Sequence, residues 1–369
     1  MYFALFTQCL NLFICLGKVM NSEQLQDWLT EVSNHFRQLE EKAVKNKSVL
    51  NHQRFLEEQA EKTQLLITYL MNNYENVSLI QPLVAQILSI YYRIGINRIF
   101  ALQLVPSLMT TYLLGIAKRQ KQSISMLETF FTAVYNEEIL AGGPDSDQMN
   151  KLVEEIKVPS LRFPSIYHDP TKLNPYPEIT QLRPNSGALV QNIVRIGPFP
   201  AVEQINAENR YLVLTRILKS LNNSLCKMAR SVICRSYCQS FLILAKSGFS
   251  FPESDFRLKL LHDKASDEDF GDHSKKPRIP LLSYFLLEAL NGIYYSLFNG
   301  TPDLALRALD AIHSRAQYDL IPDVLLMTNA IRSNLKEPEA VQMMLEIEPQ
   351  NLPHSAKANG DNISCKRFG

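Results

Sequence analysis

The sequence has few of the residue patterns on which enzyme active sites are built. It contains no G-x-x-x-x-G-K-[ST], no G-x-G-x-x-G, no G-x-S-x-G and no H-E-x-x-H. These motifs bind nucleotides, present a nucleophilic serine or hold a catalytic zinc ion. The seven histidines are scattered singly, and the six cysteines form no C-x-x-C pair. The motifs therefore predict no catalytic residue, no metal site and no cofactor.

The chain also lacks an excess of either charge. Its 38 basic and 37 acidic residues leave a net charge of +1. A chain so evenly charged has no overall positive field, so nucleic-acid binding is not predicted. Cys234 and Cys238 lie one helical turn apart, but zinc would need two more ligands with suitable spacing. We interpret these cysteines as small hydrophobic residues of a helix in a reducing compartment.

Residues 1–19 are apolar between Tyr2 and Gly17, which is short for a membrane span. They have no basic start and no clear cleavage site, so a secretory signal is not favoured. We expect residues 1–19 to be an upstream extension outside the fold, with Met20 as the working start. A signal or membrane anchor and an additional helix are the alternatives.

Apolar residues at three- and four-residue spacing predict a helical N-terminal half over residues 20–141. Pro106 is expected to kink a long helix running from Asn97 to Lys118. The sequence Ala141–Asp145, AGGPD, should end this series. The predicted helices cover residues 22–36, 51–72, 78–94, 97–118 and 123–139.

The segment 159–200 holds eight prolines with apolar residues between them, so it predicts an ordered, non-helical connector. Tyr167 is expected to anchor it, and QNIVRIG (191–197) is expected to be a short strand. Helices should return over residues 201–335, interrupted by a charged mobile loop at 252–278. Residues 336–369 are predicted to be a disordered tail, apart from a brief helix at VQMMLEIE.

The stretch from Ile279 to Leu335 is predicted to form three helices joined by short turns. Pro280, Pro302 and Pro322 suit first helical turns, and Thr301 is expected to cap the second helix. The helix over residues 281–298 is apolar on more than one face, so it should be buried on several sides. Its apolar residues Ile293, Tyr294 and Phe298 are candidates for the core or for a partner-binding face.

Two further groups of residues could have a specific function, one in catalysis and one in membrane contact. The sequence Tyr167–Asp169 places a histidine beside a carboxylate, a pair that could serve as a general base, although no nucleophile is evident and a structural turn is favoured. Two basic clusters, KRQK (118–121) and KKPR (275–278), could contact acidic lipids. Each has fewer than the four to eight charges that such contact usually needs, so solvated charge is the favoured interpretation.

Several blocks of the sequence resemble the hyccin family. The specific ones are IKVPSLRFPSIYHDP, AENRYLVLT and the long block PRIPLLSYFLLEALNGIYYSLFNGTPDLALRALDAIHSRAQYDLIPDVLLMTNAI. Weaker similarity lies in LSIYYRIGINRIFALQLVPSLMTTYLL and in the opening SEQLQDWL. The resemblance covers roughly residues 20–335, which we take as one hyccin-like domain.

The resemblance implies an all-α, non-enzymatic interaction subunit of the phosphatidylinositol 4-kinase complex of the plasma membrane. It implies binding to a tetratricopeptide-repeat scaffold subunit, and through it to the type III alpha kinase. It also implies a cytoplasmic protein that a palmitoylated anchor protein recruits peripherally to the membrane, where it supports phosphatidylinositol 4-phosphate synthesis. The alternatives are a helical adaptor unrelated to lipid kinases, an enzyme using Tyr167–Asp169, and a protein anchored in the membrane by residues 1–19.

Overall fold

The computed structural model describes residues 20–46, 52–93, 95–119, 121–140, 154–158, 192–196, 199–252, 254–261 and 270–346. The chain divides into two compact units. One unit combines the chain up to Tyr135 with the chain from Glu203 onward, and the other spans Asn136–Val202.

The first unit is all-α, as predicted. Its N-terminal helices are α2 (Ser22–Asn46), α3 (His52–Glu58), α4 (Ala60–Asn72), α5 (Val77–Tyr91), α6 (Ile96–Leu102), α7 (Val105–Ala117) and α8 (Lys121–Tyr135). After the excursion into the second unit come α10 (Arg210–Asn222), the short 3₁₀-helix η3 (Leu225–Lys227), α11 (Arg230–Lys246), α12 (Asp255–Leu261), α13 (Ser283–Leu297), α14 (Pro302–Asp319), α15 (Pro322–Asn334) and α16 (Pro338–Leu345).

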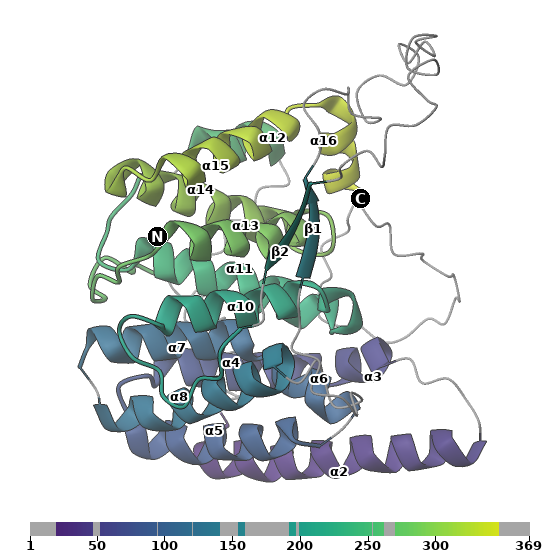
Figure 1. Cartoon of the computed structure of the whole chain (residues 1–369). Helices are drawn as coiled ribbons and strands as arrows, with labels where there is room; N and C mark the ends of the chain where they lie inside the picture. Colours follow the sequence, from purple (N-terminus) through teal and green to yellow (C-terminus); the bar gives the residue numbers. More distant parts are fainter. Residues whose placement is uncertain are drawn as a thin grey trace, which may run out of the picture. The chain divides into compact units, whose positions relative to one another are not determined.

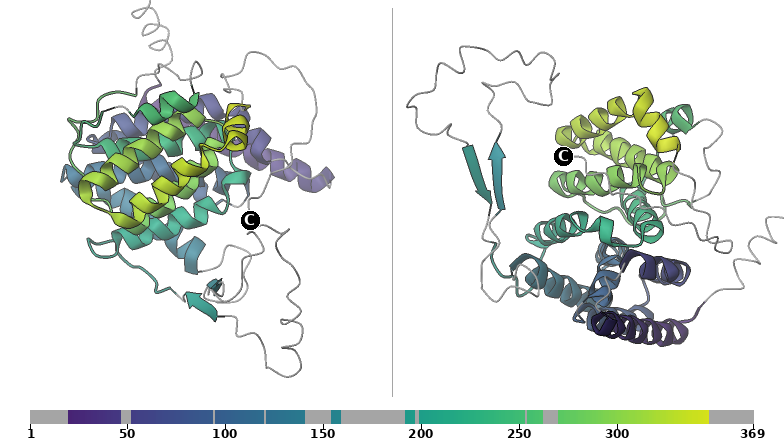
Figure 2. Two further views of the ribbon diagram at one scale, coloured as in Figure 1. Left: turned by 90° about the horizontal axis from the view of Figure 1, so that it is seen from above. Right: turned by 90° about the vertical axis from the view of Figure 1, so that its right-hand side faces the viewer.

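These helices lie on one another broadly in chain order, from α2 to α15 (Figure 1). Helix α2 packs on α5, α5 on α8, and α7 on both α8 and α11. Helix α11 in turn packs on α13 and α14, and α14 packs on α15. Figure 2 shows the same stack from two further sides. Most of these helices therefore bury apolar residues against two or more neighbouring helices.

The centre of the stack is α7, in which every side chain from Val105 to Gly115 is buried. The stretch Ile96–Ala117 is apolar and long enough to cross a membrane by composition, but 83% of its most apolar 18-residue window is buried inside the protein. Burial by other helices therefore accounts for its apolar character. The predicted kink at Pro106 was wrong, because the chain leaves the helix at Gln103–Leu104 and Pro106 lies in the first turn of α7, where a proline fits.

Other predicted boundaries also differ from the structure. The helix expected at residues 51–72 is broken at Gln59 into α3 and α4. The segment 252–278, predicted to be a mobile loop, contains α12 and the buried side chain of His273. The brief helix expected at VQMMLEIE is present as α16, which begins earlier, at Pro338, and whose Met344 is buried. Burial of Leu260 and Leu261 orders α12, although the charged sequence around it suggested a mobile loop.

The second unit carries a single antiparallel pair of strands within its described residues. Strand β1 (Glu154–Val158) pairs with β2 (Asn192–Ile196), with Ile156 opposite Val194. The strand expected at QNIVRIG is thus confirmed, and its partner EEIKV was missed. The Asn136 side chain, in the π-helix η1 (Asn136–Leu140), joins the ends of this unit through two hydrogen bonds with the Val202 backbone.

Candidate partner-binding surface

Helix α13 lies at the centre of the C-terminal helices and contacts α10, α11, α14 and α15. Its inward face includes Phe285, Leu286 and Ile293, each at most 1% exposed. This arrangement explains why the helix is apolar on more than one face. The first turns of α14 and α15 begin with Pro302 and Pro322, as predicted.

Some predicted details of these helices were wrong. Pro280 precedes α13 rather than lying in its first turn, because the helix begins at Ser283. Thr301 stands at the start of α14, but its side chain forms no capping hydrogen bond. The fixed φ angle of Pro302 therefore starts α14 without the hydroxyl cap that the sequence suggested.

A close contact between α11 and α13 sets the position of α13. Gly292 faces the buried ring of Tyr237, and a Cβ atom at this glycine would lie 2.1 Å from the ring. The Tyr237 hydroxyl donates a hydrogen bond to Oδ1 of Asn222, at 3.1 Å. Nδ2 of the same Asn222 donates to the carbonyl of Glu288, at 3.0 Å. A glycine is therefore required where the two helices approach most closely.

The predicted candidates on α13 occupy different environments. Ile293 belongs to the core, whereas Tyr294 and Phe298 are half-buried. The Tyr294 and Phe298 rings meet edge to face with centroids 5.3 Å apart. They form one aromatic pair at the border between core and surface. Tyr167, and the Tyr167–Asp169 group with it, lie outside the described residues.

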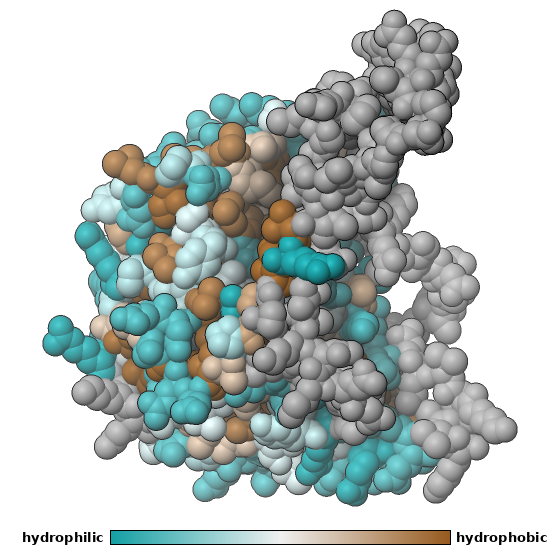
Figure 3. Space-filling model, in the orientation of Figure 1, coloured by the Kyte–Doolittle hydropathy of each residue, from teal (hydrophilic) through white to brown (hydrophobic). Residues whose placement is uncertain are grey.

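Exposed apolar side chains gather where α13 and α15 begin. The start of α13 is tied to α15 by a hydrogen bond of 3.3 Å from the Ser283 hydroxyl to Asp323. Around this contact the apolar residues and their exposed fractions are Leu282 at 41%, Tyr284 at 43%, Leu326 at 75% and Met327 at 36%. We call these four residues the α13–α15 patch. Figure 3 shows hydrophobic surface over this part of the molecule.

The α13–α15 patch was not predicted from the sequence. Leu326 and Met327 belong to an apolar run, VLLM, and periodicity cannot tell which residues of such a run face outward. Exposed apolar residues become informative when the fold gathers them, because contiguous apolar surface commonly marks a binding site.

Helix α15 is fixed from beneath by polar contacts with α14. Arg332 forms an ion pair with Asp310, and His313 lies 2.8 Å from the Thr328 hydroxyl. Burial lowers the pKa of His313 to about 4, so its imidazole is neutral at physiological pH. The patch is therefore carried on a rigid helix rather than on a loop.

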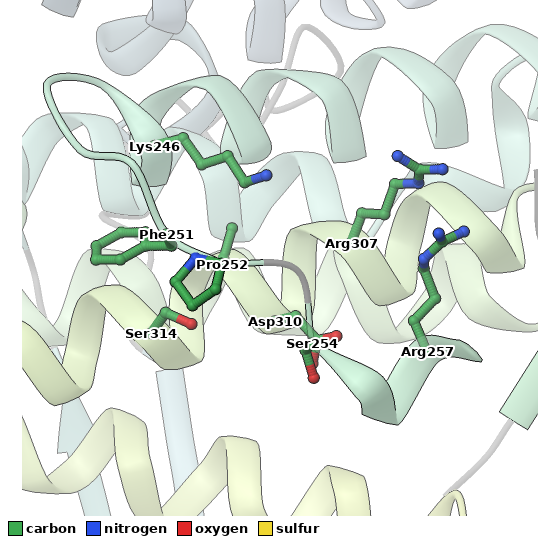
Figure 4. A pocket seen from close by; sticks show the side chains of 9 residues that line it. Lys246, Phe251, Pro252, Ser254, Arg257, Arg307, Asp310 and Ser314 are labelled. Carbon is green, nitrogen blue, oxygen red and sulfur yellow. The ribbon is translucent and has the colours of Figure 1, made fainter. Parts of the chain in front are cut away.

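A cavity of about 140 Å³ lies near the junction of α11, α12 and α14 (Figure 4). Its lining includes the cations of Lys246, Arg257 and Arg307, and the side chains of Ser254 and Asp310. Asp303 forms ion pairs with both Arg257 and Arg307. Carboxylates of the protein thus neutralise much of this charge, and we interpret the cavity as a structural ion-pair cluster.

The described residues contain no group of three or more histidine, cysteine or acidic side chains suited to a metal ion. Burial raises the pKa of both the Cys234 and the Cys238 thiols to about 12. A buried neutral thiol is a poor nucleophile. These cysteines therefore act as packing residues, and the exposed surface rather than a reactive group is the best candidate site.

A comparison with models of known protein families gives a match. The chain matches the family model described as Hyccin over residues 48–358. The match includes α13, α15 and all four residues of the α13–α15 patch.

Proposed function

The chain belongs to the hyccin family, and from this premise we propose that it is a non-catalytic adaptor subunit of a phosphatidylinositol 4-kinase complex. In this proposal it binds a tetratricopeptide-repeat scaffold, which joins it to the type III alpha kinase. A palmitoylated anchor protein brings the assembly to the plasma membrane, where it supports phosphatidylinositol 4-phosphate synthesis. The chain itself is cytoplasmic and associates with the membrane peripherally.

The α13–α15 patch is the observation that supports an adaptor role most directly. Burying a large apolar side chain contributes about 1.5–3 kcal/mol, and Leu326 and Tyr284 offer such side chains on ordered helices. A helical-repeat scaffold presents grooves between helices that accept apolar and aromatic side chains. We propose that the scaffold covers this patch and that Leu326, the most exposed of its residues, enters such a groove.

Affinity purification of the full chain from cells tests the proposed partners. The scaffold and the kinase should both be recovered, and loss of the chain should lower phosphatidylinositol 4-phosphate at the plasma membrane. Recovery of neither protein with correctly folded bait would refute the lipid-kinase assignment. Recovery of a different helical assembly would support the alternative, an adaptor unrelated to lipid kinases.

The substitution Leu326→Glu tests the proposed surface. Because Leu326 is largely exposed, the fold should tolerate the change within about 0.5 kcal/mol. At a covered interface the new carboxylate would be buried without a partner, costing at least about 2 kcal/mol, or about 30-fold in affinity for the scaffold.

Leu212→Glu, at a half-exposed leucine of α10 outside the α13–α15 patch, is the matched control. It should leave scaffold binding unchanged. If both variants lost scaffold binding equally, or if neither lost it, the assignment of the patch would be contradicted.

A further inference from the structure

The fold brings together two basic segments that are far apart in the sequence. Lys118 and Arg119 follow α7, whereas Lys275, Lys276 and Arg278 lie in the segment before α13. One residue of each segment, Lys118 and Lys276, lies beside the turn between α4 and α5, which carries Tyr74 and Glu75. Lys118 forms an ion pair of 3.2 Å with Glu75. Nζ of Lys276 lies 5.1 Å from the centroid of the Tyr74 ring.

Lys276 is close enough to the other charges to respond to them. Burial lowers the pKa of its ammonium group, with Glu75 opposing this effect and the like charge of Lys118 adding to it. Glu75 in turn has its pKa lowered by hydrogen bonds from Tyr74 and Lys118, and both Lys118 and Lys276 favour its charged form. The two basic segments therefore act on the same carboxylate.

The combined surface carries more charge than either segment alone. We call Lys118, Arg119, Lys275, Lys276 and Arg278 the basic surface. Lys118 and Lys276 lie near the carboxylate of Glu75, and Lys275 lies near that of Asp272. Arg278 extends the surface to the end of α11, where its guanidinium lies over the Phe249 ring and donates a hydrogen bond to the Gly248 carbonyl. The five cations and two carboxylates together carry a net charge of +3. The whole chain carries only +1. The rest of the protein is therefore slightly acidic, and positive charge is concentrated at this site.

Two cations of the basic surface stand out. Within the described part of the chain, Arg119 and Lys275 are exposed and belong to no ion pair. Arg119 also has a φ angle of +59°, a left-handed conformation that glycine adopts at lower cost after a helix. A helix C-terminus favours basic residues electrostatically, but that explanation does not apply to Lys275, which lies outside any helix.

We propose that the basic surface binds the anionic face of a lipid membrane directly. Five cations fall within the four to eight that attract a protein to acidic headgroups, a number that neither sequence cluster reaches. The cations lie on two separate segments, and a planar anionic surface can contact both together without a cavity or a fixed spacing of phosphates. This contact goes beyond the proposed adaptor role, because it needs only the charges of this chain.

Sedimentation with vesicles tests the proposal on the full chain. Phosphatidylcholine vesicles with added phosphatidylserine should bind the protein, and vesicles of phosphatidylcholine alone should bind it much less. The difference in binding between the two kinds of vesicle excludes any apolar contribution to binding, because both kinds share it. Raising salt from about 0.1 M to about 1 M, which shortens the Debye length from ~10 Å to ~3 Å, should abolish the difference.

The double variant Arg119→Gln/Lys275→Gln removes two charges that belong to no ion pair among the described residues, although Lys275 favours the charged form of Asp272. It should weaken binding to the anionic vesicles about 30-fold, since each basic residue near such a surface contributes about fivefold. The matched control Lys227→Gln/Lys336→Gln removes two exposed charges elsewhere. The affinity of this control variant for anionic vesicles should stay within about twofold of that of the original protein.

Equal binding to both kinds of vesicle, or equal loss by the two double variants, would overturn the proposal. Stoichiometric binding of soluble inositol hexakisphosphate without any preference for anionic vesicles would also overturn it, in favour of a free-phosphate site. Capture of the scaffold is measured separately, so failure here leaves the proposed adaptor function unaffected.

Discussion

The contact between Gly292 and Tyr237 predicts that a single added methyl group destabilises the protein. At Gly292 a Cβ atom would lie 2.1 Å from Cζ of Tyr237 and within 2.6 Å of two further ring atoms. The ring is buried and tied to Asn222, so it cannot rotate away freely. Gly292→Ala therefore requires α13 and the ring to separate by about 1 Å or more.

Opposing effects determine how much Gly292→Ala changes the free energy of unfolding. Alanine is favoured over glycine inside a helix by about 1 kcal/mol. Overpacking a buried site costs about 1–3 kcal/mol, and a strained or broken hydrogen bond of the Tyr237 hydroxyl costs about 1–3 kcal/mol. The steric effects should prevail, and we expect Gly292→Ala to lower the free energy of unfolding by about 2–4 kcal/mol.

Guanidinium unfolding followed by circular dichroism measures this free energy. Gly115→Ala is the matched control, because it also lies inside a helix and its added Cβ would meet only Ile124 Cγ1, at 3.6 Å. That substitution should be neutral or stabilise the protein by up to about 1 kcal/mol.

The Tyr237→Leu background separates the ring contact from other effects of Gly292→Ala. Without the ring, adding alanine should be nearly neutral, which gives a coupling energy of about 2 kcal/mol or more. A protein with Gly292→Ala that is as stable as the original would refute the packing argument. The packing argument would also be refuted if Gly292→Ala lowered stability equally with Tyr237 present and with Leu in its place.

Further predictions follow from burial, protonation and backbone conformation. Among the described cysteines, iodoacetamide at pH 8 should modify the exposed Cys226 in the native protein and leave Cys234 and Cys238 unmodified by mass spectrometry, because burial raises the pKa of both thiols to about 12. His313 has its pKa lowered from 6.5 to about 4, so the unfolded chain binds more protons between these values. The neutral His313 should therefore contribute about 1–2 kcal/mol to the free energy of unfolding above pH 6.5, and this contribution should be lost as the pH falls toward 4. In urea titrations, His313→Gln should reduce this dependence of stability on pH. Leu320→Gly should raise the free energy of unfolding by about 0.5–1 kcal/mol, because Leu320 is exposed and has a φ angle of +55°; lower stability would contradict this account.

Periodicity predicted most helices because an amphipathic helix records its buried face in its sequence. Pro302 and Pro322 located the starts of α14 and α15, and the C-terminal helices were found within a few residues. Strand β2 was recognised, but its partner EEIKV carries too few apolar residues to signal a strand alone. The breaks at Gln59 and Gln103 were missed, because neither residue is a helix breaker and the packing of neighbouring helices decides where the chain turns.

The candidate surfaces were less predictable than the helices. The sequence singled out α13 by its apolar character, but Ile293 faces the core while Tyr294 and Phe298 lie at its border. The exposed Leu326 was not distinguished from its apolar neighbours. Which residue of such a run stays exposed depends on the partners of each helix, and these partners come from distant parts of the chain.

By itself, the sequence determined the all-α class, the ordinary charge balance, the lack of familiar catalytic motifs and the resemblance to the hyccin family. These properties depend on residue types and short-range spacing, which can be read along the chain. Only the tertiary structure decided which surfaces exist. It gathered Leu282 and Tyr284 with Leu326 and Met327, and it joined Lys118 and Arg119 to Lys275, more than 150 residues away. A surface is made by residues close in space, and helix packing determines that closeness.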